Sequence, residues 1–414
     1  MKKTIVLLIT CDTKPEEAAY IKRRLEQMGV NAVVADTGVR GAPGIDPDIT
    51  REELAELGGA AFSEIEEISA KGLRGAAVAK MTEALVPALA RLYREGRLDG
   101  VVCVGGAGSF IGAPAMQALP LGVPKVIVSP LASGARMFAP FVGNSDIMVM
   151  HSVTDIAGMN DYSRKIYDNA AAAVAGMALS RDKFDSITDD RKYIGVTMMG
   201  TTTPGATAAV RILEGAGYGC VVFHATGVGG SSMEKLIREN AFAGVLDFTL
   251  AEMVGTHVAG FTKTNPERLS VAGEYGVPQV VVPGAVDFIN LYPHETEQYK
   301  YRVIYNHNPQ TPLMRATKEE MLIVAGKIAE QLNKGKGRTT VAAPLRGFSD
   351  PNREGGAFWD PESDDAFRRK LKNGLKDNIK YLEVDAWIND VVFGETAAGE
   401  LIEIIGVGKA AVKK

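Results

Sequence analysis

Several kinds of residue are scarce in this sequence of 414 residues, and each scarcity excludes a class of protein. There are only three cysteines, Cys11, Cys103 and Cys220, and none belongs to a CxxC pair. So small and odd a number argues against a disulfide framework and a cysteine zinc site, and it suits a reducing compartment. Aromatic residues make up only 7% of the chain, beside 46% hydrophobic and 23% charged residues, which is the balance of an ordinary globular protein.

An excess of positive charge is also missing, because 46 Lys and Arg residues face 50 Asp and Glu residues, for a net charge of −4. This balance predicts that neither nucleic acid nor an anionic membrane is a partner. The apolar run Ile5–Ile9 follows Lys2 and Lys3 like a signal peptide, but it is too short and soon meets Asp12. No run approaches the roughly 20 apolar residues of a membrane helix. We therefore expect a cytoplasmic protein.

The most informative feature that is present is an internal repeat. The segment Lys2–Gly41 resembles Arg191–Gly230, and the two copies end in TGVRG and TGVGG. A second pair of matching segments follows in the same order, GVPKVIVSP at Gly122–Pro130 and GVPQVVVPG at Gly276–Gly284. A period of about 190 residues indicates duplicated domains, because the units of a solenoid are only about 20–50 residues long.

Each copy opens with the same pattern of residues. Ile5–Ile9 and Ile194–Met198 have the length and composition of buried parallel strands. A short polar loop follows, and Pro15 or Pro204 then falls in a predicted first helical turn, where its missing N–H is harmless. A second apolar run comes next, so each copy predicts a strand, a helix and a parallel strand joined by a right-handed crossover.

Further strands are predicted in both halves, and they define the fold class. Val101–Val104 and Lys125–Val128 are expected to complete the first sheet. In the second half a strand at Gln279–Val282 precedes a C-terminal extension that the first copy lacks, with strands at Thr339–Ala343 and Tyr381–Val384. The sequence predicts an α/β protein of two tandem Rossmann-like open parallel sheets, internally duplicated, with domains at residues 1–182 and 190–414. A single eight-fold barrel is the alternative.

Glycine-rich and polar loops follow the predicted strands of the first domain. Ligands of open parallel sheets bind outside the carboxyl ends of the strands, so we expect these loops to surround a nucleotide. Asp36 stands where an acidic group commonly meets ribose, and glycine amides can approach phosphates closely. The candidate residues are Asp12, Thr13, Lys14, Asp36, Gly38, Arg40, Gly105, Gly106, Gly108, Ser109, Ser129, Ser133 and Gly134. The GxGxxG and Walker patterns of phosphate-binding loops are missing. The alternative to a nucleotide site is that these glycines only form turns and contact no ligand.

The second domain offers a parallel set of candidates. Gly227, Gly229 and Gly230 lead into Ser231-x-x-Glu234, which has the form of a capping box at a helix N-terminus and suits phosphate. The plainer interpretation is that Ser231 only caps the helix. His224 could act as an acid or base near neutral pH, but no histidine spacing indicates a metal site. The second set is Thr201, Thr202, His224, Gly227, Gly229, Gly230 and Ser231.

Eight segments together resemble one family over essentially the whole chain. They read CDTKPEE, ADTGVRG, GVPKVIVSPLASG, HSVTDIAGMN, GTTTPG, FHATGVGG, NHNPQTPLMR and WIND. The sequence is similar to the Tm-one-like ATP-binding-domain family, which includes a plant resistance protein against tomato mosaic virus and bacterial members of uncharacterised function. The resemblance implies two Rossmann-like domains, ATP bound at the first with or without Mg²⁺, and a homodimer. Phe110 departs from the small polar residue that relatives have in a GGSGGT-like loop.

These observations lead to two functional expectations. The first is a cytoplasmic ATP-binding protein that holds its nucleotide at the carboxyl strand ends of the first domain, with no reaction assigned. The alternative is a metabolic enzyme that acts on a small phosphorylated or carboxylated metabolite at the interdomain or second-domain crevice.

Overall fold

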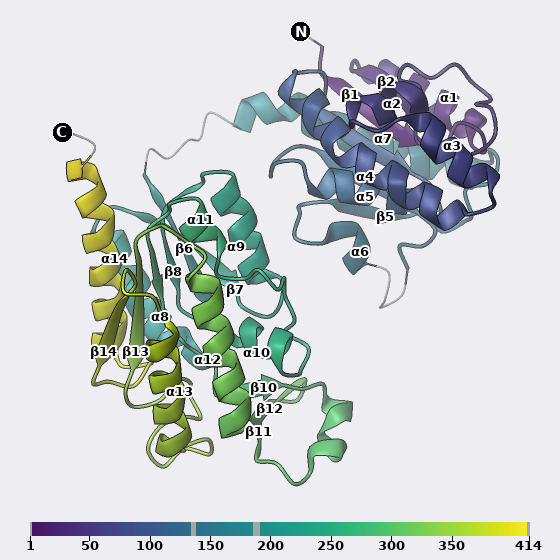
Figure 1. Cartoon of the computed structure of the whole chain (residues 1–414). Helices are drawn as coiled ribbons and strands as arrows, with labels where there is room; N and C mark the ends of the chain where they lie inside the picture. Colours follow the sequence, from purple (N-terminus) through teal and green to yellow (C-terminus); the bar gives the residue numbers. More distant parts are fainter. Residues whose placement is uncertain (1, 134–137, 185–190, 412–414) are drawn as a thin grey trace. The chain divides into compact units, whose positions relative to one another are not determined.

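The computed structural model describes residues 2–133, 138–184 and 191–411 and contains two compact units, Met1–Thr188 and Asp189–Lys414 (Figure 1). Each unit has its own parallel sheet and its own hydrophobic core. Within the described ranges, no helix is long and apolar enough to cross a membrane.

The first unit contains a five-stranded parallel sheet in the order β2-β1-β3-β4-β5. Its strands are β1 (Thr4–Ile9), β2 (Asn31–Asp36), β3 (Gly100–Val104), β4 (Lys125–Ser129) and β5 (Met148–His151). Its helices are α1 (Pro15–Gln27), α2 (Arg51–Leu57), α3 (Phe62–Ala70), α4 (Arg74–Arg94), α5 (Ser109–Gln117), α6 (Ala139–Val142) and α7 (Asp161–Phe184).

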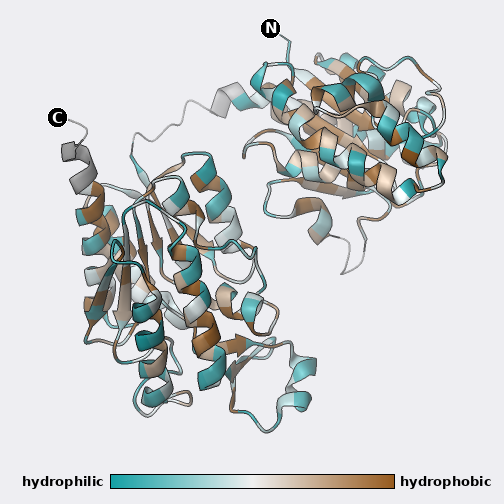
Figure 2. Cartoon of the chain, in the orientation of Figure 1, coloured by the Kyte–Doolittle hydropathy of each residue, from teal (hydrophilic) through white to brown (hydrophobic). Residues whose placement is uncertain are grey.

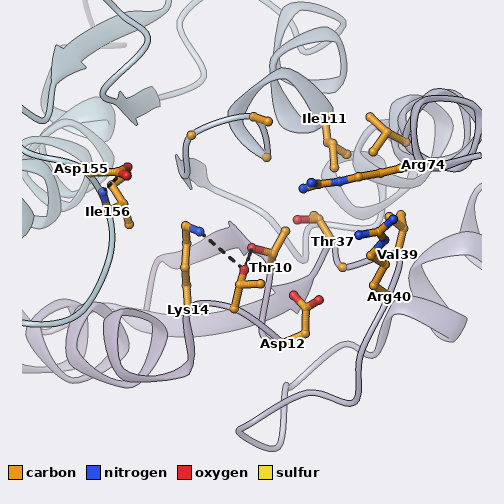
Figure 3. A pocket seen from close by; sticks show the side chains of 16 residues that line it. Thr10, Asp12, Lys14, Thr37, Val39, Arg40, Arg74, Ile111, Asp155 and Ile156 are labelled. Atoms are coloured by element: carbon orange, nitrogen blue, oxygen red, sulfur yellow. Dashed lines mark hydrogen bonds between the residues drawn. The ribbon is translucent and has the colours of Figure 1, made fainter. Parts of the chain in front are cut away.

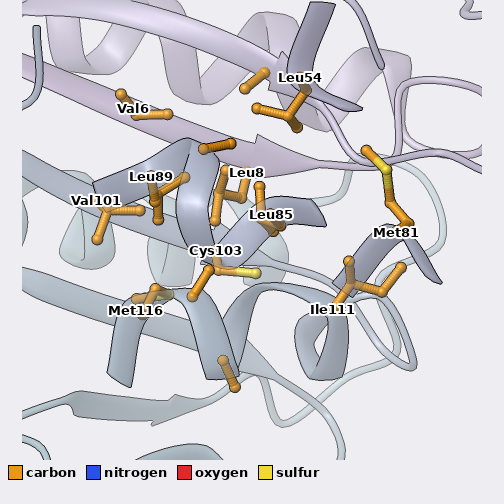
Figure 4. Packing of buried hydrophobic residues seen from close by; sticks show 14 of the residues in the cluster. Val6, Leu8, Leu54, Met81, Leu85, Leu89, Val101, Cys103, Ile111 and Met116 are labelled. Atoms are coloured by element: carbon orange, nitrogen blue, oxygen red, sulfur yellow. The ribbon is translucent and has the colours of Figure 1, made fainter. Parts of the chain in front are cut away.

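Helices cover both faces of this sheet because successive strand residues point to opposite sides. Leu8 and Cys103 pack on one face with residues of α4 and α5, in the cluster shown in Figure 4. Ile5 and Leu7 pack on the other face with residues of α1 and α7. The central strands are therefore apolar along their length, whereas hydrophilic residues lie on the outer helices (Figure 2). Strands buried on both faces need this composition.

The second unit contains a six-stranded parallel sheet in the order β14-β13-β9-β8-β6-β7 and a three-stranded antiparallel sheet in the order β10-β12-β11. Its strands are β6 (Tyr193–Met198), β7 (Gly219–His224), β8 (Phe242–Asp247), β9 (Gln279–Val281), β10 (Phe288–Asn290), β11 (Ile304–Asn308), β12 (Thr311–Arg315), β13 (Thr339–Pro344) and β14 (Lys380–Val384). Its α-helices are α8 (Thr203–Gly215), α9 (Gly229–Arg238), α10 (Ala251–His257), α11 (Val271–Glu274), α12 (Lys318–Leu332), α13 (Pro361–Gly374) and α14 (Val391–Ala411). Two short 3₁₀ helices are η1 (Gly200–Thr202) and η2 (Pro293–Tyr299).

The two parallel sheets share one topology. Taken from its other edge, the second sheet runs β7-β6-β8-β9-β13-β14, which repeats the order β2-β1-β3-β4-β5 and adds one strand. The prediction of two duplicated Rossmann-like parallel sheets is confirmed, and the barrel alternative is wrong. One part of the expected extension is misassigned, because β13 occupies the place of β5, so the added strands are β14 and those of the antiparallel sheet. The sequence analysis missed β5 itself.

Two local predictions have different outcomes. Helix α1 begins at Pro15, as expected. The capping box predicted at Ser231 is wrong, because α9 already begins at Gly229 and the Ser231 hydroxyl donates to the carbonyl of Val228. A hydroxyl inside the first turn bonds back to the preceding turn and does not cap the helix.

Candidate functional site

A cavity of about 310 Å³ opens at the carboxyl ends of β1, β2 and β3 in the first unit (Figure 3). The strand order places β1 between β2 and β3, so the connections that follow β1 and β3 diverge at this point. Such a switch point leaves a crevice between the two loops, and open α/β sheets bind their ligands there. The topology therefore accounts for the position of the cavity.

Seven of the residues predicted for nucleotide binding line this cavity. They are Asp12, Thr13, Lys14, Gly38, Arg40, Gly106 and Gly108. The structure adds lining residues that were not among the predicted set: Thr10, Thr37, Val39, Arg74, Val78, Ala107, Ile111, Asp155 and Ile156. Of these, Arg74 begins α4 and Asp155 follows β5, so both reach the cavity from segments remote in sequence. In the sequence, the only signal for Asp155 was that it belongs to HSVTDIAGMN, one of the segments that carry the family resemblance.

Asp36 was expected to face ribose, but its side chain is fully buried and is not among the residues that line the cavity. Its Oδ1 accepts hydrogen bonds from the amide of Cys11, at 2.9 Å, and from the amide of Gly38, at 2.8 Å. Burial raises the pKa of Asp36, although the two amides act in the opposite direction. Asp36 therefore ties the loop after β1 to the loop after β2, and through them it shapes the cavity.

The predicted serines and two glycines also lie outside the lining. The Ser109 hydroxyl donates to the carbonyl of Gly106 at 2.6 Å and lies 3.0 Å from the hydroxyl of Ser129, so both serines stabilise the loops. Gly105 is buried behind the same loop, where an added Cβ would lie 3.2 Å from the amide nitrogen of Ser109. Ser133 is exposed, and Gly134 lies outside the described residues.

Unpaired backbone donors gather at the cavity. Helices α1, α4 and α5 all begin beside it, so their positive dipole ends face one space. The amides of Gly106, Ala107 and Gly108 have no acceptor within the described residues. Gly106 and Gly108 are half-buried and Ala107 is exposed, so a ligand can reach these amides. N–H groups without partners at a helix N-terminus favour an anion such as phosphate.

The charged side chains of the cavity add to this preference. Lys14, Arg40 and Arg74 supply three cations, against the carboxylates of Asp12 and Asp155. In Figure 3, Arg40 and Arg74 lie beside Thr37, and neither guanidinium has an ion-pair partner among the described residues. Oδ1 of Asp12 is buried without a hydrogen-bond partner in the same part of the chain. The lining therefore presents uncompensated donors and one uncompensated acceptor.

The second candidate set is arranged differently, because a carboxylate of the protein occupies its glycine loop. The amides of Gly227 and Gly230 both donate to Oε1 of Glu252, at 2.9 Å and 3.0 Å. Glu252 comes from the first turn of α10 and is fully buried. The predicted attraction of this helix N-terminus for an anion is present, and an internal anion satisfies it.

Glu252 belongs to a buried charge cluster centred on Arg268. The Arg268 guanidinium donates to Oε2 of Glu252 at 2.9 Å and to Oδ1 of Asp247 at 2.7 Å, and it lies 3.5 Å from Oε1 of Glu234. None of these four side chains is more than 2% exposed. Burial raises the pKa of Glu234 to about 6, with Arg268 acting in the opposite direction. We call this group the Arg268 cluster.

The side chains of Thr201, Thr202 and His224 in the second set have other surroundings. Thr202 is buried, and its hydroxyl lies 2.7 Å from that of Thr249. Oγ1 of Thr201 is buried without a partner in the described part of the chain. His224 is exposed at the end of β7, and an added Cβ at Gly229 would lie 2.0 Å from its carbonyl oxygen. No group of three or more His, Cys, Asp or Glu side chains within the described ranges could hold a metal ion.

Comparisons with known proteins add family information. The domain models of the uncharacterised protein family UPF0261 match residues 3–183 (N-terminal domain) and 191–405 (C-terminal domain). A UPF0261 protein of Clostridium tetani is 41% identical over 98% of this chain and 100% of its own length. The tomato protein named ToMV resistance protein Tm-1(GCR237), from Solanum lycopersicum, is 38% identical over 80% of this chain and 45% of its own length. The solved glycosyltransferase VinC is 12% identical over 97% of this chain and 99% of its own, at a TM-score of only 0.18.

Proposed function

Because the chain belongs to the UPF0261 family, which the resemblance to Tm-one-like proteins anticipated, we propose that its first unit binds ATP in the cavity at the carboxyl ends of β1, β2 and β3. One observation carries the proposal: three helix N-termini, the free amides of residues 106–108 and three cations converge on that cavity. A triphosphate is the ligand that uses so many donors at once. A volume of about 310 Å³ is near the lower limit of small-molecule sites.

The carboxylates of the cavity fit a nucleotide that carries Mg²⁺. The cation prefers oxygen ligands and keeps several waters, so it needs only one or two protein carboxylates beside the phosphates. Asp12 and Asp155 line the cavity, and Oδ1 of Asp12 has no other partner among the described residues. Asp12 would contact the hydrated ion, which would neutralise part of the triphosphate charge.

Isothermal titration calorimetry of the full chain with ATP, with and without Mg²⁺, tests the proposal. Arg74→Gln should weaken ATP about tenfold, since a charge-assisted hydrogen bond to phosphate is lost. Arg94→Gln is the matched control, because Arg94 is exposed at the opposite end of the same helix. Absence of binding at millimolar ATP, or equal affinities of the two variants, would contradict the proposal.

We also infer that two copies of the chain associate through β5. In the second unit, β13 is covered by β14, whereas no described strand pairs with the outer edge of β5 in the first. A cavity of about 570 Å³ lies beside this edge, lined by Met148 and Met177 among others, and Met148 is 47% exposed. A second copy would pair the free edge and cover these methionines. Sedimentation of the wild type and of Met148→Lys tests this interface. A wild type that sediments as a monomer would exclude it, and so would a Met148→Lys variant that forms the same dimer as the wild type.

A cytoplasmic location is the third part of the proposal. The cysteines Cys11, Cys103 and Cys220 are all free thiols, which suits a reducing compartment. Recovery of the protein in the soluble cytoplasmic fraction of cells is the expected result, and recovery outside the cell would contradict it.

The alternative function, a metabolite site at the second glycine loop, has less support, because the carboxylate of Glu252 already accepts hydrogen bonds from the amides of that loop.

A further inference from the structure

A separate pocket of about 330 Å³ lies at the carboxyl edge of the second sheet, beyond β13 and β14. Its walls are formed by Arg346, Arg353, Glu354, Trp359 and Trp387. Four of them come from the segment that joins β13 to α13, and Trp387 follows β14. Adjacent parallel strands bring these two connections together at the edge where α/β sheets bind ligands. The chain has only two tryptophans, and both are here.

The walls of the pocket are held in place by buried contacts behind them. The indole N–H of Trp387 donates to the carbonyl of Ser349 at 2.9 Å. The hydroxyl of Ser349 donates in turn to Oδ2 of Asp287 at 2.7 Å, and Phe348 and Phe358 anchor the segment in the core. Connections this long without regular structure are uncommon in compact domains, and they usually serve binding. The two indoles, both half-buried, therefore form a preformed aromatic surface.

The charges of the pocket restrict the ligand further. Arg346 is neutralised by a two-fold hydrogen bond to Asp385, at 2.8 Å and 2.9 Å. The guanidinium carbon of Arg353 lies 5.1 Å from the centre of the Trp387 ring, and no carboxylate among the described residues pairs with it. Glu354 and Asp385 keep the surroundings from becoming strongly positive, which disfavours a polyphosphate. One uncompensated guanidinium beside two aromatic faces suits a flat monoanion.

We propose that this pocket binds a small aromatic monocarboxylate. Its ring packs against the indoles of Trp359 and Trp387, and its carboxylate accepts hydrogen bonds from Arg353. The geometry lies in the second unit and uses no residue of the ATP cavity, so the two proposals stand or fall separately.

Tryptophan fluorescence of the full chain tests the proposal directly, because both fluorophores line the pocket. Benzoate and phenylacetate serve as probes, and we expect at least one to change the fluorescence saturably. Cyclohexanecarboxylate, which has the charge without the ring, and benzamide, which has the ring without the charge, should each bind at least about tenfold more weakly than benzoate. Calorimetry should give the same affinities, which separates binding from absorption of the exciting light.

Variants locate the binding. Arg353→Met keeps the length of the side chain but removes the charge, and it should weaken the carboxylates about tenfold. Arg211→Met is the control, since Arg211 is exposed on α8 away from the pocket. Trp359→Leu should remove binding while Trp387 remains as the reporter, and Trp359→Phe should restore most of it. If no probe binds at millimolar concentration, or if Arg353→Met binds like the wild type, the proposal is wrong.

Discussion

The two units repeat one strand order, yet the matching glycine loops at their carboxyl edges have different surroundings. In the first unit, the amide of Gly38 in the TGVRG segment donates to Asp36, but Gly38 and Arg40 also line an open cavity. In the second, the matching TGVGG segment gives the amides of Gly227 and Gly230 to the carboxylate of Glu252. On the proposed function, one framework holds an external anion in the first unit and an anion of its own chain in the second, because helix N-termini attract both.

The internal anion changes what the second loop contributes to the protein. A bound nucleotide stabilises a fold only when it is present, whereas the Arg268 cluster is permanent. Burying four charged groups is expensive, and the cost is offset only while each group keeps its partners. We therefore expect substitutions at this edge to affect folding in the second unit and ligand binding in the first.

The largest effect is expected for Arg268→Met, because it leaves Asp247, Glu252 and Glu234 buried without their cation. Breaking a buried ion pair costs about 3–5 kcal/mol, and this change breaks several contacts at once. Urea unfolding followed by tryptophan fluorescence reports the second unit alone, since both tryptophans belong to it. Arg369→Met, at an exposed ion pair on α13, is the control and should leave the midpoint unchanged. Similar midpoints for both variants would show that the Arg268 cluster is not structural.

A smaller loss, about 2–3 kcal/mol, is expected for Glu252→Ala, since Arg268 keeps its contact with Asp247. The change also frees the amides of Gly227 and Gly230, so inorganic phosphate should bind and raise the unfolding midpoint of the variant. The wild type should not respond to phosphate at this unit. Glu252→Gln keeps an acceptor oxygen for the amides and should respond as little as the wild type. A Glu252→Ala protein that ignores phosphate would show that the loop has lost its affinity for anions.

Local signals in the sequence predicted most of the framework. An apolar run such as Ile5–Ile9 and a first-turn proline such as Pro15 are local signals, and the structure has a strand and a helix at these positions. β5 was missed because it is short and half-exposed, so its residues Met148–His151 lack a buried-strand pattern. The new antiparallel sheet, with β11 largely exposed, was missed for a similar reason.

The candidate site was only partly predictable, because chain position does not fix where a side chain points. Asp36 ends β2 as expected, but it turns inward to the amides of Cys11 and Gly38. Arg74 and Asp155 reach the cavity through tertiary packing. The same holds for Glu252, whose interaction with Gly227 spans 25 residues and has no local sequence pattern.

Substitutions at two glycines, one in each unit, test the comparison, and their expected effects are of intermediate size. An added Cβ at Gly106 would meet only Pro130, at 4.0 Å, whereas one at Gly229 would lie 2.0 Å from the backbone oxygen of His224. Gly229→Ala should therefore destabilise the second unit by about 1–3 kcal/mol. Gly106→Val should leave unfolding unchanged and weaken ATP about tenfold, because a branched side chain blocks close approach to the backbone. Calorimetry and urea unfolding followed by circular dichroism, which reports both units, check this for both variants, and the reverse pattern would contradict the comparison.

The smallest effect concerns Asp364, a second buried charge near the carboxyl edge of the second sheet. Its Oδ1 accepts hydrogen bonds from Arg315, at 2.8 Å, and Asn352, at 3.2 Å, while its Oδ2 is buried without a partner among the described residues. Burial raises its pKa to about 7, although Arg315 acts in the opposite direction. The folded state therefore binds one proton more than the unfolded chain between about pH 4 and pH 7. This contribution to stability is complete at low pH and is lost as the pH rises through 7.

Asp364→Asn imitates the protonated carboxyl at every pH, so it should remove this part of the pH dependence. Between about pH 6 and pH 7 the wild type should lose about 1 kcal/mol more unfolding free energy than the variant. Asp365→Asn is the control, since the neighbouring carboxylate is 45% exposed and should leave the slope unchanged. Glu234 titrates in the same range in all three proteins and cancels in their differences. Parallel pH profiles for the wild type and Asp364→Asn would mean that Asp364 stays ionised in the fold, and that its unpaired oxygen is stabilised by contacts with water.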